Sequence, residues 1–182
     1  MDSNSKDKVS KIKMLISDVD GVLTDGTIYK SNTGDELKKF NVTDGSGIAM
    51  ARAIDLKIAL ISGRYSKATA LRAKELRITE LYNGTLDKRE PYAELKKKYK
   101  LKDDQIAYLG DDIIDLPVME KVGVPIAVAN AVDIIKDVSL HITAKSGGDG
   151  AFREAIDWII TVQGRYDEAL RTVRRKIFKN KK

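Results

Sequence analysis

Short apolar runs alternate along the chain with longer segments in which apolar residues recur every three or four positions. The short runs are rich in Ile, Leu and Val and end near Gly, Asp or Asn, which is typical of strands. The longer segments have the period of helices that pack against a sheet. This alternation predicts an α/β fold, a Rossmann-like parallel sheet sandwiched by helices, with no cap domain. The predicted strands are residues 12–17, 57–62, 78–83, 105–110, 124–129 and 139–143, and the predicted helices are residues 47–56, 67–76, 89–99, 115–122 and 151–160.

One segment departs from the alternation. Residues 27–40, TIYKSNTGDELKKF, contain two extended stretches separated by SNTG, a pattern that predicts a small β-hairpin. A chain of 182 residues, 42% of them hydrophobic, is long enough for one buried core and short for two. We therefore expect a single domain over residues 1–182, with a flexible N-terminus over residues 1–10 and a basic extension over about 165–182.

Composition excludes several kinds of site. The chain has no cysteine and a single histidine, His141, so disulfides, thiolate chemistry and multi-histidine metal sites are excluded. No stretch approaches the roughly 20 apolar residues of a membrane span, and MDSNSKDKVSK lacks the apolar segment of a signal peptide. We expect a cytoplasmic protein with no membrane partner.

The positive charge is unevenly distributed. The net charge is +6, and much of the excess lies in KKKYKLK, residues 96–102, and in the last twelve residues, RTVRRKIFKNKK. Few aromatic residues are interleaved there, as a platform for stacking nucleic-acid bases would need. We expect a solvated basic end and no nucleic-acid partner, although a cationic field also attracts small anionic substrates.

Polar and charged residues follow four of the predicted strands. Because ligands of open parallel sheets bind at the carboxyl ends of the strands, where the strand order switches, we expect these residues to share one site. They are Asp18, Asp20, Ser62, Gly63, Arg64, Lys88, Asp111, Asp112 and Asp115.

Five carboxylates at one edge would repel one another, and without compensation some would be protonated. A divalent cation removes this conflict. Ligation by oxygen alone suits Mg²⁺, which binds through one or two carboxylates and substrate phosphate oxygens. The sequence therefore predicts a Mg²⁺ site, although Ser62 and Gly63 alone would indicate only a turn, and Lys88 alone a solvated side chain.

The order DVDGVLTDG, ISGR, a lone lysine and GDDIIDLP resembles the motifs of the haloacid dehalogenase superfamily of phosphatases. The segments KKFNVTDGSGI, NGTLDK and GGDGAFRE are similar to its capless phosphatases of 3-deoxy-D-manno-octulosonate 8-phosphate. The resemblance extends from about Lys13 to Trp158 and departs at Thr43, where the family often has arginine.

The resemblance implies a Mg²⁺-dependent phosphatase in lipopolysaccharide precursor biosynthesis, which releases the free sugar acid and phosphate through an aspartyl-phosphate. A phosphatase of a nine-carbon, sialic-acid-type 9-phosphate and a non-catalytic binding or oligomerisation module of the same fold are alternatives. A response-regulator receiver domain carries similar residues, but its acidic pair and phosphate acceptor follow different strands.

The predicted catalytic residues are the nucleophile Asp18 and the general acid–base Asp20, which lies two residues on and therefore on the same side of an extended segment. Ser62 and Lys88 are expected to stabilise the transferring phosphoryl group, and Lys88 to keep Asp18 ionised. Asp112 and Asp115 could act through waters or by orienting Lys88. Asp111 is the carboxylate expected to bind Mg²⁺ directly, and the resemblance implies that Asp18 and the backbone carbonyl of Asp20 bind it too. With Asp112, the predicted metal-binding residues are thus Asp18, Asp20, Asp111 and Asp112.

Arg64 is expected to bind the substrate carboxylate, because its planar guanidinium group can form two hydrogen bonds with a carboxylate. Related nine-carbon phosphatases often have glutamate at this position, so Arg64 favours the eight-carbon substrate. Arg72, two helical turns on, could serve the same pocket or an interface. The predicted substrate-binding residues are Ser62, Gly63, Arg64, Arg72 and Lys88.

The spacing of the motifs leaves no room for a cap domain: 43 residues separate Asp18 from Ser62, and 25 separate Ser62 from Lys88. The resemblance implies a homotetramer in which neighbouring chains do the work of a cap, and the hairpin edge suits such pairing. The segment KSGGDGAFRE, residues 145–154, could reach across an interface or simply form the turn into a helix. We assign no catalytic role to His141 or Trp158.

Overall fold

A six-stranded parallel sheet, in the order β5-β4-β1-β6-β7-β8, forms the centre of the computed structural model, which describes residues 2–179. β1 and β6 are buried along their whole length, as expected of central strands covered on both faces. The strands are β1 (Met14–Ser17), β4 (Lys57–Ser62), β5 (Glu80–Asn83), β6 (Ile106–Gly110), β7 (Val124–Ala127) and β8 (His141–Ile142).

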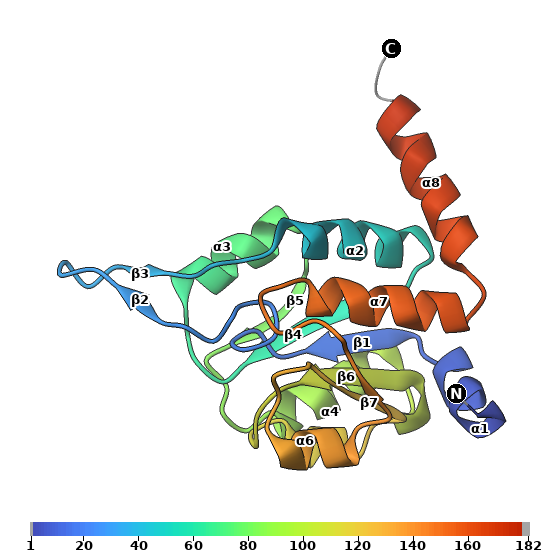
Figure 1. Ribbon diagram of the computed structural model, residues 1–182, viewed down its shortest axis with the longest axis horizontal. Coiled ribbons are helices and arrows are strands. Elements are labelled where there is room, and N and C mark those ends of the chain that lie inside the picture. The colour runs from blue at the N-terminus through green and yellow to red at the C-terminus, as the bar shows by residue number, and fades with distance from the viewer. Residues whose placement is uncertain (1, 180–182) are drawn as a thin grey trace.

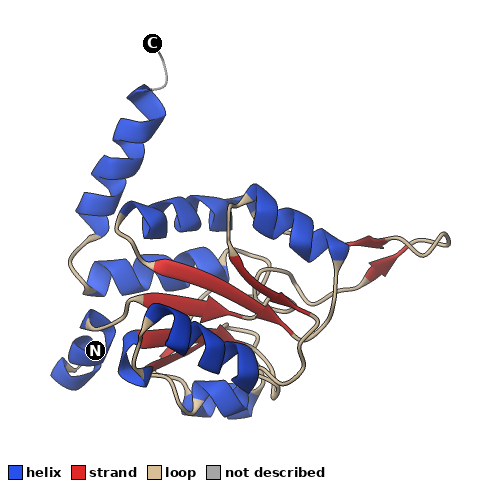
Figure 2. Cartoon of the chain, turned by 180° about the vertical axis from the view of Figure 1, so that it is seen from behind, coloured by secondary structure: helices blue, strands red, loops and turns tan. Residues whose placement is uncertain are grey.

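Helices cover both faces of this sheet (Figures 1 and 2). One face carries α2 (Val42–Ala53), α3 (Lys67–Glu75) and α7 (Ala151–Val162), and the other carries α4 (Arg89–Tyr99), α5 (Leu116–Met119) and α6 (Asp133–Val138). A short 3₁₀ turn, η1 (Asp103–Gln105), precedes β6. The predicted fold class is confirmed.

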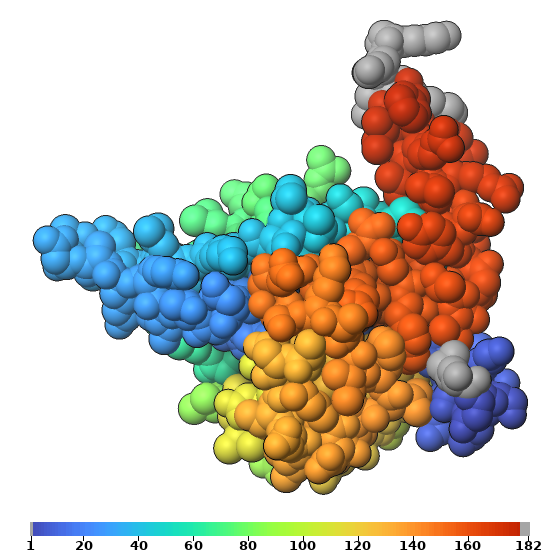
Figure 3. All heavy atoms as spheres, in the orientation of Figure 1, coloured from blue at the N-terminus to red at the C-terminus, as the bar shows by residue number. Residues whose placement is uncertain are grey.

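The predicted hairpin is also present. β2 (Tyr29–Lys30) pairs antiparallel with β3 (Glu36–Leu37), and the pair projects from the body of the molecule (Figures 1 and 3). Gly34 has a φ of +89°, which the turn at the tip requires. Ile28, Tyr29 and Leu37 are exposed on the hairpin, so it offers an apolar surface outside the core.

Both ends of the chain are more regular than the sequence predicts. α1 (Ser3–Ser10) occupies the segment expected to be flexible, because Asp2 accepts a hydrogen bond from Ser5 N (2.7 Å) and Val9 is buried. α8 (Tyr166–Lys179) occupies the basic extension and reaches away from the sheet (Figure 1). The extension beyond residue 179 lies outside the described residues.

Two internal elements also differ from the prediction. α2 begins at Val42, earlier than predicted, because the Asn41 side chain accepts a hydrogen bond from Thr43 N (2.9 Å) and caps the helix. α6 was not predicted, and it is only six residues long. His141 stacks on Trp158 with ring centroids 4.2 Å apart, which gives both side chains a packing role.

The strand order reverses beside β1: β4 and β5 lie on one side of it, and β6, β7 and β8 on the other. Loops that leave adjacent strands in opposite directions open a crevice at the carboxyl ends of those strands. Among the helices of residues 2–179, none combines the length and apolar character needed to cross a membrane.

Candidate active site

Three carboxylates meet at the point where the strand order reverses. Asp18 follows β1, while Asp111 and Asp115 follow the adjacent β6, and one oxygen from each lies within 4.8 Å of the others. The backbone fixes this arrangement, because Asp18 N donates a hydrogen bond to Leu109 O of β6 (3.0 Å). The structure therefore brings together Asp18, Asp111 and Asp115, all three of which the sequence places at this edge of the sheet.

Lys88 supplies the positive charge of this cluster. It stands just before α4, and its completely buried Nζ lies 2.9 Å from Asp18 Oδ1 and 2.6 Å from Asp115 Oδ1. Burial alone would lower the pKa of Lys88, but Asp18 and Asp115 outweigh it and raise the pKa above its ordinary value. Lys88 therefore stays cationic between two carboxylates. We call Asp18, Lys88, Asp111 and Asp115 the floor of the site.

Asp115 orients Lys88. Its Oδ1 also accepts a hydrogen bond from the Tyr108 hydroxyl (2.7 Å), and its Oδ2 accepts from the backbone N–H groups of Asp111 (3.0 Å) and Asp112 (3.3 Å). A buried carboxylate with this many donors is well stabilised and held in one orientation. Of the roles left open for Asp115 by the sequence, the geometry agrees with orienting Lys88.

The negative charges of Asp18 and Asp111 are offset less completely by nearby donors and cations. Burial, and then the charge of Asp115, raise the pKa of Asp18, although Lys88 opposes them. Burial, and then the charge of Asp18, raise the pKa of Asp111. Among the described residues, buried Asp111 Oδ1 has no hydrogen-bond partner. An unpartnered carboxylate oxygen beside a repelling carboxylate fits a divalent cation, which Asp18 and Asp111 would hold.

Asp112 lies apart from the floor. Its side chain is exposed, and Oδ1 accepts the hydrogen bond of Ile113 N (2.7 Å). The structure thus does not bring Asp112 to the other carboxylates, because the turn after β6 directs Asp115 inward and Asp112 outward. A metal-binding role for Asp112 stays a prediction.

Ser62 and Asp20 approach each other beside the floor. Ser62 ends β4, and its buried Oγ donates to Arg64 O (2.8 Å) and lies 3.5 Å from Asp20 Oδ2. Gly63 follows in a confined place, where a Cβ would lie 3.0 Å from Ile114 Cδ1. The predicted hydroxyl donor and the predicted acid–base therefore share one side of the crevice.

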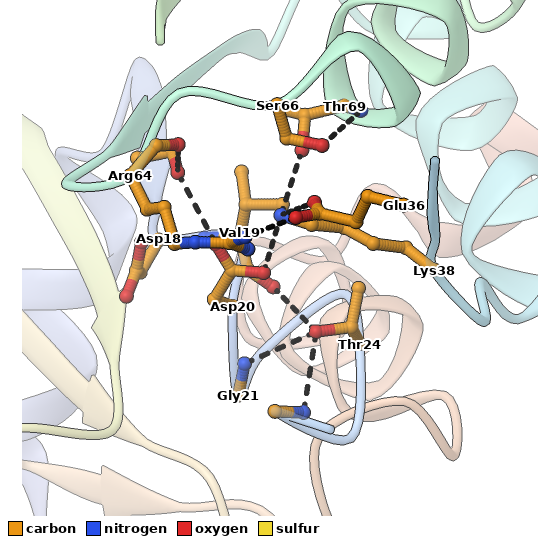
Figure 4. A network of polar contacts seen from close by, with 12 residues as sticks. Asp18, Val19, Asp20, Gly21, Thr24, Glu36, Lys38, Arg64, Ser66 and Thr69 are labelled. Carbon is orange, nitrogen blue, oxygen red and sulfur yellow. Dashed lines mark hydrogen bonds and ion pairs between the residues drawn. The ribbon is translucent and has the colours of Figure 1, made fainter. Parts of the chain in front are cut away.

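Two residues of the hairpin also enter this region, and sequence reasoning missed both. Lys38 Nζ lies 2.5 Å from Asp20 Oδ1, and Glu36 pairs through Oε2 with Arg64 Nη2 (Figure 4). The only local signal is the period of two in an extended strand, which places Glu36 and Lys38 on one face and exposed Leu37 on the other. We call Glu36, Lys38 and Arg64 the rim of the site.

Arg72 lies further along α3. Its Nη1 donates to Glu75 Oε2 (2.8 Å) and its Nη2 to Asn41 O (3.2 Å). None of the polar contacts found for Arg72 in the described part of the chain reaches another predicted site residue. A substrate-binding role for Arg72 stays a prediction.

Gly21 and Gly147 allow the loop after β1 to pack closely against Asp111 on one side and against residues 145–150 on the other. Gly21 has a φ of +91°, and a Cβ there would lie 1.9 Å from Asp111 Oδ2. A Cβ on Gly147 would lie 1.7 Å from Gly21 O. Residues 145–150 therefore pack against the loop after β1 in the same chain and then lead into α7.

Known proteins share both the sequence and the fold. Residues 19–154 match the family model described as haloacid dehalogenase-like hydrolase. The 3-deoxy-D-manno-octulosonate 8-phosphate phosphatase KdsC of Escherichia coli (strain K12) is 46% identical over 89% of this chain and 86% of that protein.

Two solved structures are also similar. The 3-deoxy-D-manno-octulosonate 8-phosphate phosphatase of Yersinia pestis has a TM-score of 0.88 and 42% identity, over 91% of this chain and 89% of that chain. The enzyme of the same description from Moraxella catarrhalis, solved in complex with magnesium ion, phosphate ion and KDO molecule, has a TM-score of 0.90 and 36% identity, over 94% of this chain and 99% of that chain.

Proposed function

Because this chain belongs to the haloacid dehalogenase-like hydrolases, and within them to the 3-deoxy-D-manno-octulosonate 8-phosphate phosphatases, we propose that it hydrolyses this sugar acid phosphate with Mg²⁺ as cofactor. The family match confirms the resemblance that the motifs indicated. The observation that carries the proposal is the floor itself, where Asp18 and Asp111 lie together with Lys88 at the carboxyl ends of the strands.

Mg²⁺ supplies positive charge that lets an anionic phosphate approach an anionic carboxylate. A carboxylate oxygen of Asp18 attacks phosphorus, and the bond between phosphorus and the sugar oxygen breaks. The electron pair stays on the sugar oxygen, which takes a proton from Asp20. Asp20 then takes a proton from water as the water oxygen bonds to phosphorus, and the bond between phosphorus and the Asp18 oxygen breaks, which releases phosphate and restores the Asp18 carboxylate.

Ser62 and Lys88 stabilise the phosphoryl group in this proposal. The Ser62 hydroxyl can turn from Arg64 O to a phosphoryl oxygen, because a hydroxyl rotates to suit its acceptor. Lys88 offsets the charge that Asp18 brings to the floor. Both groups are buried, so water screens their interactions weakly.

In this proposal Arg64 binds the carboxylate of the sugar acid. One of its terminal nitrogens, Nη2, pairs with Glu36, while Nη1 is buried and has no hydrogen-bond partner among the described residues. A substrate carboxylate can therefore bind Nη1 or replace Glu36 on the guanidinium group.

The test is phosphate release by the purified protein from a panel of sugar acid phosphates, with Mg²⁺ and after treatment with EDTA. We expect turnover of 3-deoxy-D-manno-octulosonate 8-phosphate that EDTA abolishes and added Mg²⁺ restores. Faster turnover of a nine-carbon 9-phosphate would favour that alternative. No release from any phosphate would favour a non-catalytic module.

The active unit in this proposal is a cytoplasmic homotetramer of single-domain chains. The supporting observation is the projecting hairpin, whose exposed Ile28, Tyr29 and Leu37 offer an apolar surface to a second copy (Figure 3). The lack of cysteine agrees with a reducing compartment. Light scattering measures the mass in solution, and a fully active monomer would contradict the assembly.

A further inference from the structure

Lys38 is a buried lysine at the base of an otherwise exposed hairpin. Its side chain is 2% exposed, whereas that of the next residue, Lys39, is 65% exposed. Burying an ammonium group is costly unless charged or polar partners surround it. The placement of Lys38 therefore depends on the groups that it contacts.

These contacts come from three separate elements (Figure 4). Lys38 Nζ lies 2.5 Å from Asp20 Oδ1 in the loop after β1, and 3.9 Å from Glu36 Oε1 of β3. It also donates a hydrogen bond to Thr69 Oγ1 (3.2 Å), a buried hydroxyl on α3. Thr69 gives the ammonium a fixed anchor in the body of the protein.

The two oxygens of Asp20 consequently have different neighbours. Oδ1 faces Lys38, which carries only donors, and Oδ2 lies 3.5 Å from Ser62 Oγ, the proposed phosphate donor. The Asp20 side chain is 31% exposed, so without Lys38 it would be free to take other rotamers toward solvent.

We propose that Lys38 is a positioning residue for Asp20: anchored on Thr69, it holds Oδ1 and thereby directs Oδ2 at the leaving oxygen of the substrate. This inference rests on the proposed function. As the phosphorus–oxygen bond breaks, the proton moves from Asp20 Oδ2 to the sugar oxygen, and Lys38 keeps all of its protons. The base of the hairpin is thus part of the reaction geometry.

Two phosphate esters separate this role from a structural one. The sugar alkoxide is a poor leaving group and needs a proton, whereas 4-nitrophenolate leaves without one. The experiment measures the single-turnover rate of leaving-group release, with enzyme in excess, for the full-length wild type, Lys38→Met, Lys38→Arg and the control Lys39→Met. The substrates are 3-deoxy-D-manno-octulosonate 8-phosphate and 4-nitrophenyl phosphate, both with Mg²⁺.

We expect Lys38→Met to lose about 10- to 100-fold in the single-turnover rate of leaving-group release from the sugar acid phosphate, a part of the roughly 10²- to 10⁴-fold that a general acid provides. On 4-nitrophenyl phosphate the loss in this first step should be less than about threefold, because 4-nitrophenolate leaves without a proton. The later attack of water, for which Asp20 takes a proton, is common to both substrates and does not enter this rate. Lys38→Arg should recover most of the lost rate. Lys39→Met should behave as the wild type on both substrates.

Equal losses on the two substrates, or no loss on either, would overturn the role of Lys38 while leaving the phosphatase proposal intact. A wild type that releases phosphate from neither ester would overturn the proposed function and this inference with it. If Lys38→Met melts at a lower temperature than the wild type, Thr69→Val provides a second variant. It should show the same substrate-selective loss at smaller size, and equal losses on both substrates would again overturn the inference.

Discussion

The floor and the rim of the site carry charges of both signs, but they hold them differently. In the floor, the side chains of Asp18, Lys88 and Asp115 are at most 4% exposed. Asp18 and Asp115 come from the loops after the central strands β1 and β6, and Lys88 from the loop between β5 and α4. In the rim, Lys38 is also buried, but Arg64 is 37% exposed and pairs with Glu36 of the projecting hairpin. The floor is thus part of the core, whereas the Arg64 side of the rim meets water.

This difference in burial suits different tasks, namely attack on phosphorus and recognition of the substrate. Buried charges interact strongly and have little freedom to move, as in-line attack on phosphorus requires. Ion pairs at a solvated surface are individually weak, so one partner can be exchanged for another at small cost. The floor therefore suits the bond-breaking step, and the partly exposed pair of Arg64 and Glu36 suits recognition of a carboxylate.

Replacing the nucleophile has the largest expected effect. Asp18→Asn should lower kcat by at least about 10⁴-fold, because the amide is a poor nucleophile for phosphorus. The same change removes a buried charge that repels Asp111 and Asp115, so the metal-free variant should melt at a higher temperature than the metal-free wild type. Phosphate release and thermal unfolding measure the two effects. Full activity in the variant would contradict Asp18 as nucleophile.

Asp44 is a buried carboxylate outside the floor. A test on Asp44 therefore measures how burial changes a pKa without the repulsion between carboxylates that also acts in the floor. It lies in the first turn of α2 and accepts a hydrogen bond from Arg153 N (3.0 Å), and burial raises its pKa to about 6. Because the folded state holds this proton more tightly than the unfolded state, Asp44 contributes stability below pH 4, which is lost as the pH rises through 6.

Between pH 4 and pH 7 the wild type should therefore lose up to about 3 kcal/mol of unfolding free energy relative to Asp44→Asn, which keeps an oxygen acceptor for Arg153 N. Urea unfolding at the two pH values gives this difference, with the exposed Asp7→Asn as a control. Parallel pH dependences of the wild type and Asp44→Asn would show that Asp44 has an ordinary pKa.

The smallest of these effects belongs to the rim. Arg64→Ala should raise KM for the sugar acid phosphate by roughly 10- to 100-fold, which corresponds to about 1.5–3 kcal/mol for hydrogen bonds to a charged group. A sugar phosphate without a carboxylate should be affected little. Equal losses on both substrates would mean that Arg64 acts on the phosphate or on the fold.

The sequence predicts the floor better than the rim for a physical reason. Asp18 and Asp111 follow strands, and parallel strands bring their carboxyl ends to one edge of the sheet. The strand pattern along the chain is therefore enough to predict that the two carboxylates lie together. Asp115 is harder to place, because only the short turn after β6 determines whether it or Asp112 points inward.

Lys38 is harder still to predict. Its position depends on how the hairpin docks against Thr69 of α3, and no periodicity along residues 27–40 encodes a contact with another element. The helices at the two ends were missed for a similar reason. α1 and α8 are rich in charged residues, and packing of a few residues such as Val9 and Ala169 against the body stabilises them.

The packing of Gly147 against Gly21 limits how this enzyme can change over generations. A methyl group at position 147 would collide with Gly21 O, and a methyl group at position 21 would collide with Asp111 Oδ2. Substitution at position 21 therefore displaces a proposed metal ligand, and substitution at position 147 displaces the loop that carries Gly21, although Gly147 is far along the chain from it. A mutation at either position has to be accompanied by a shift of that loop, so each glycine restricts the substitutions that the other position tolerates.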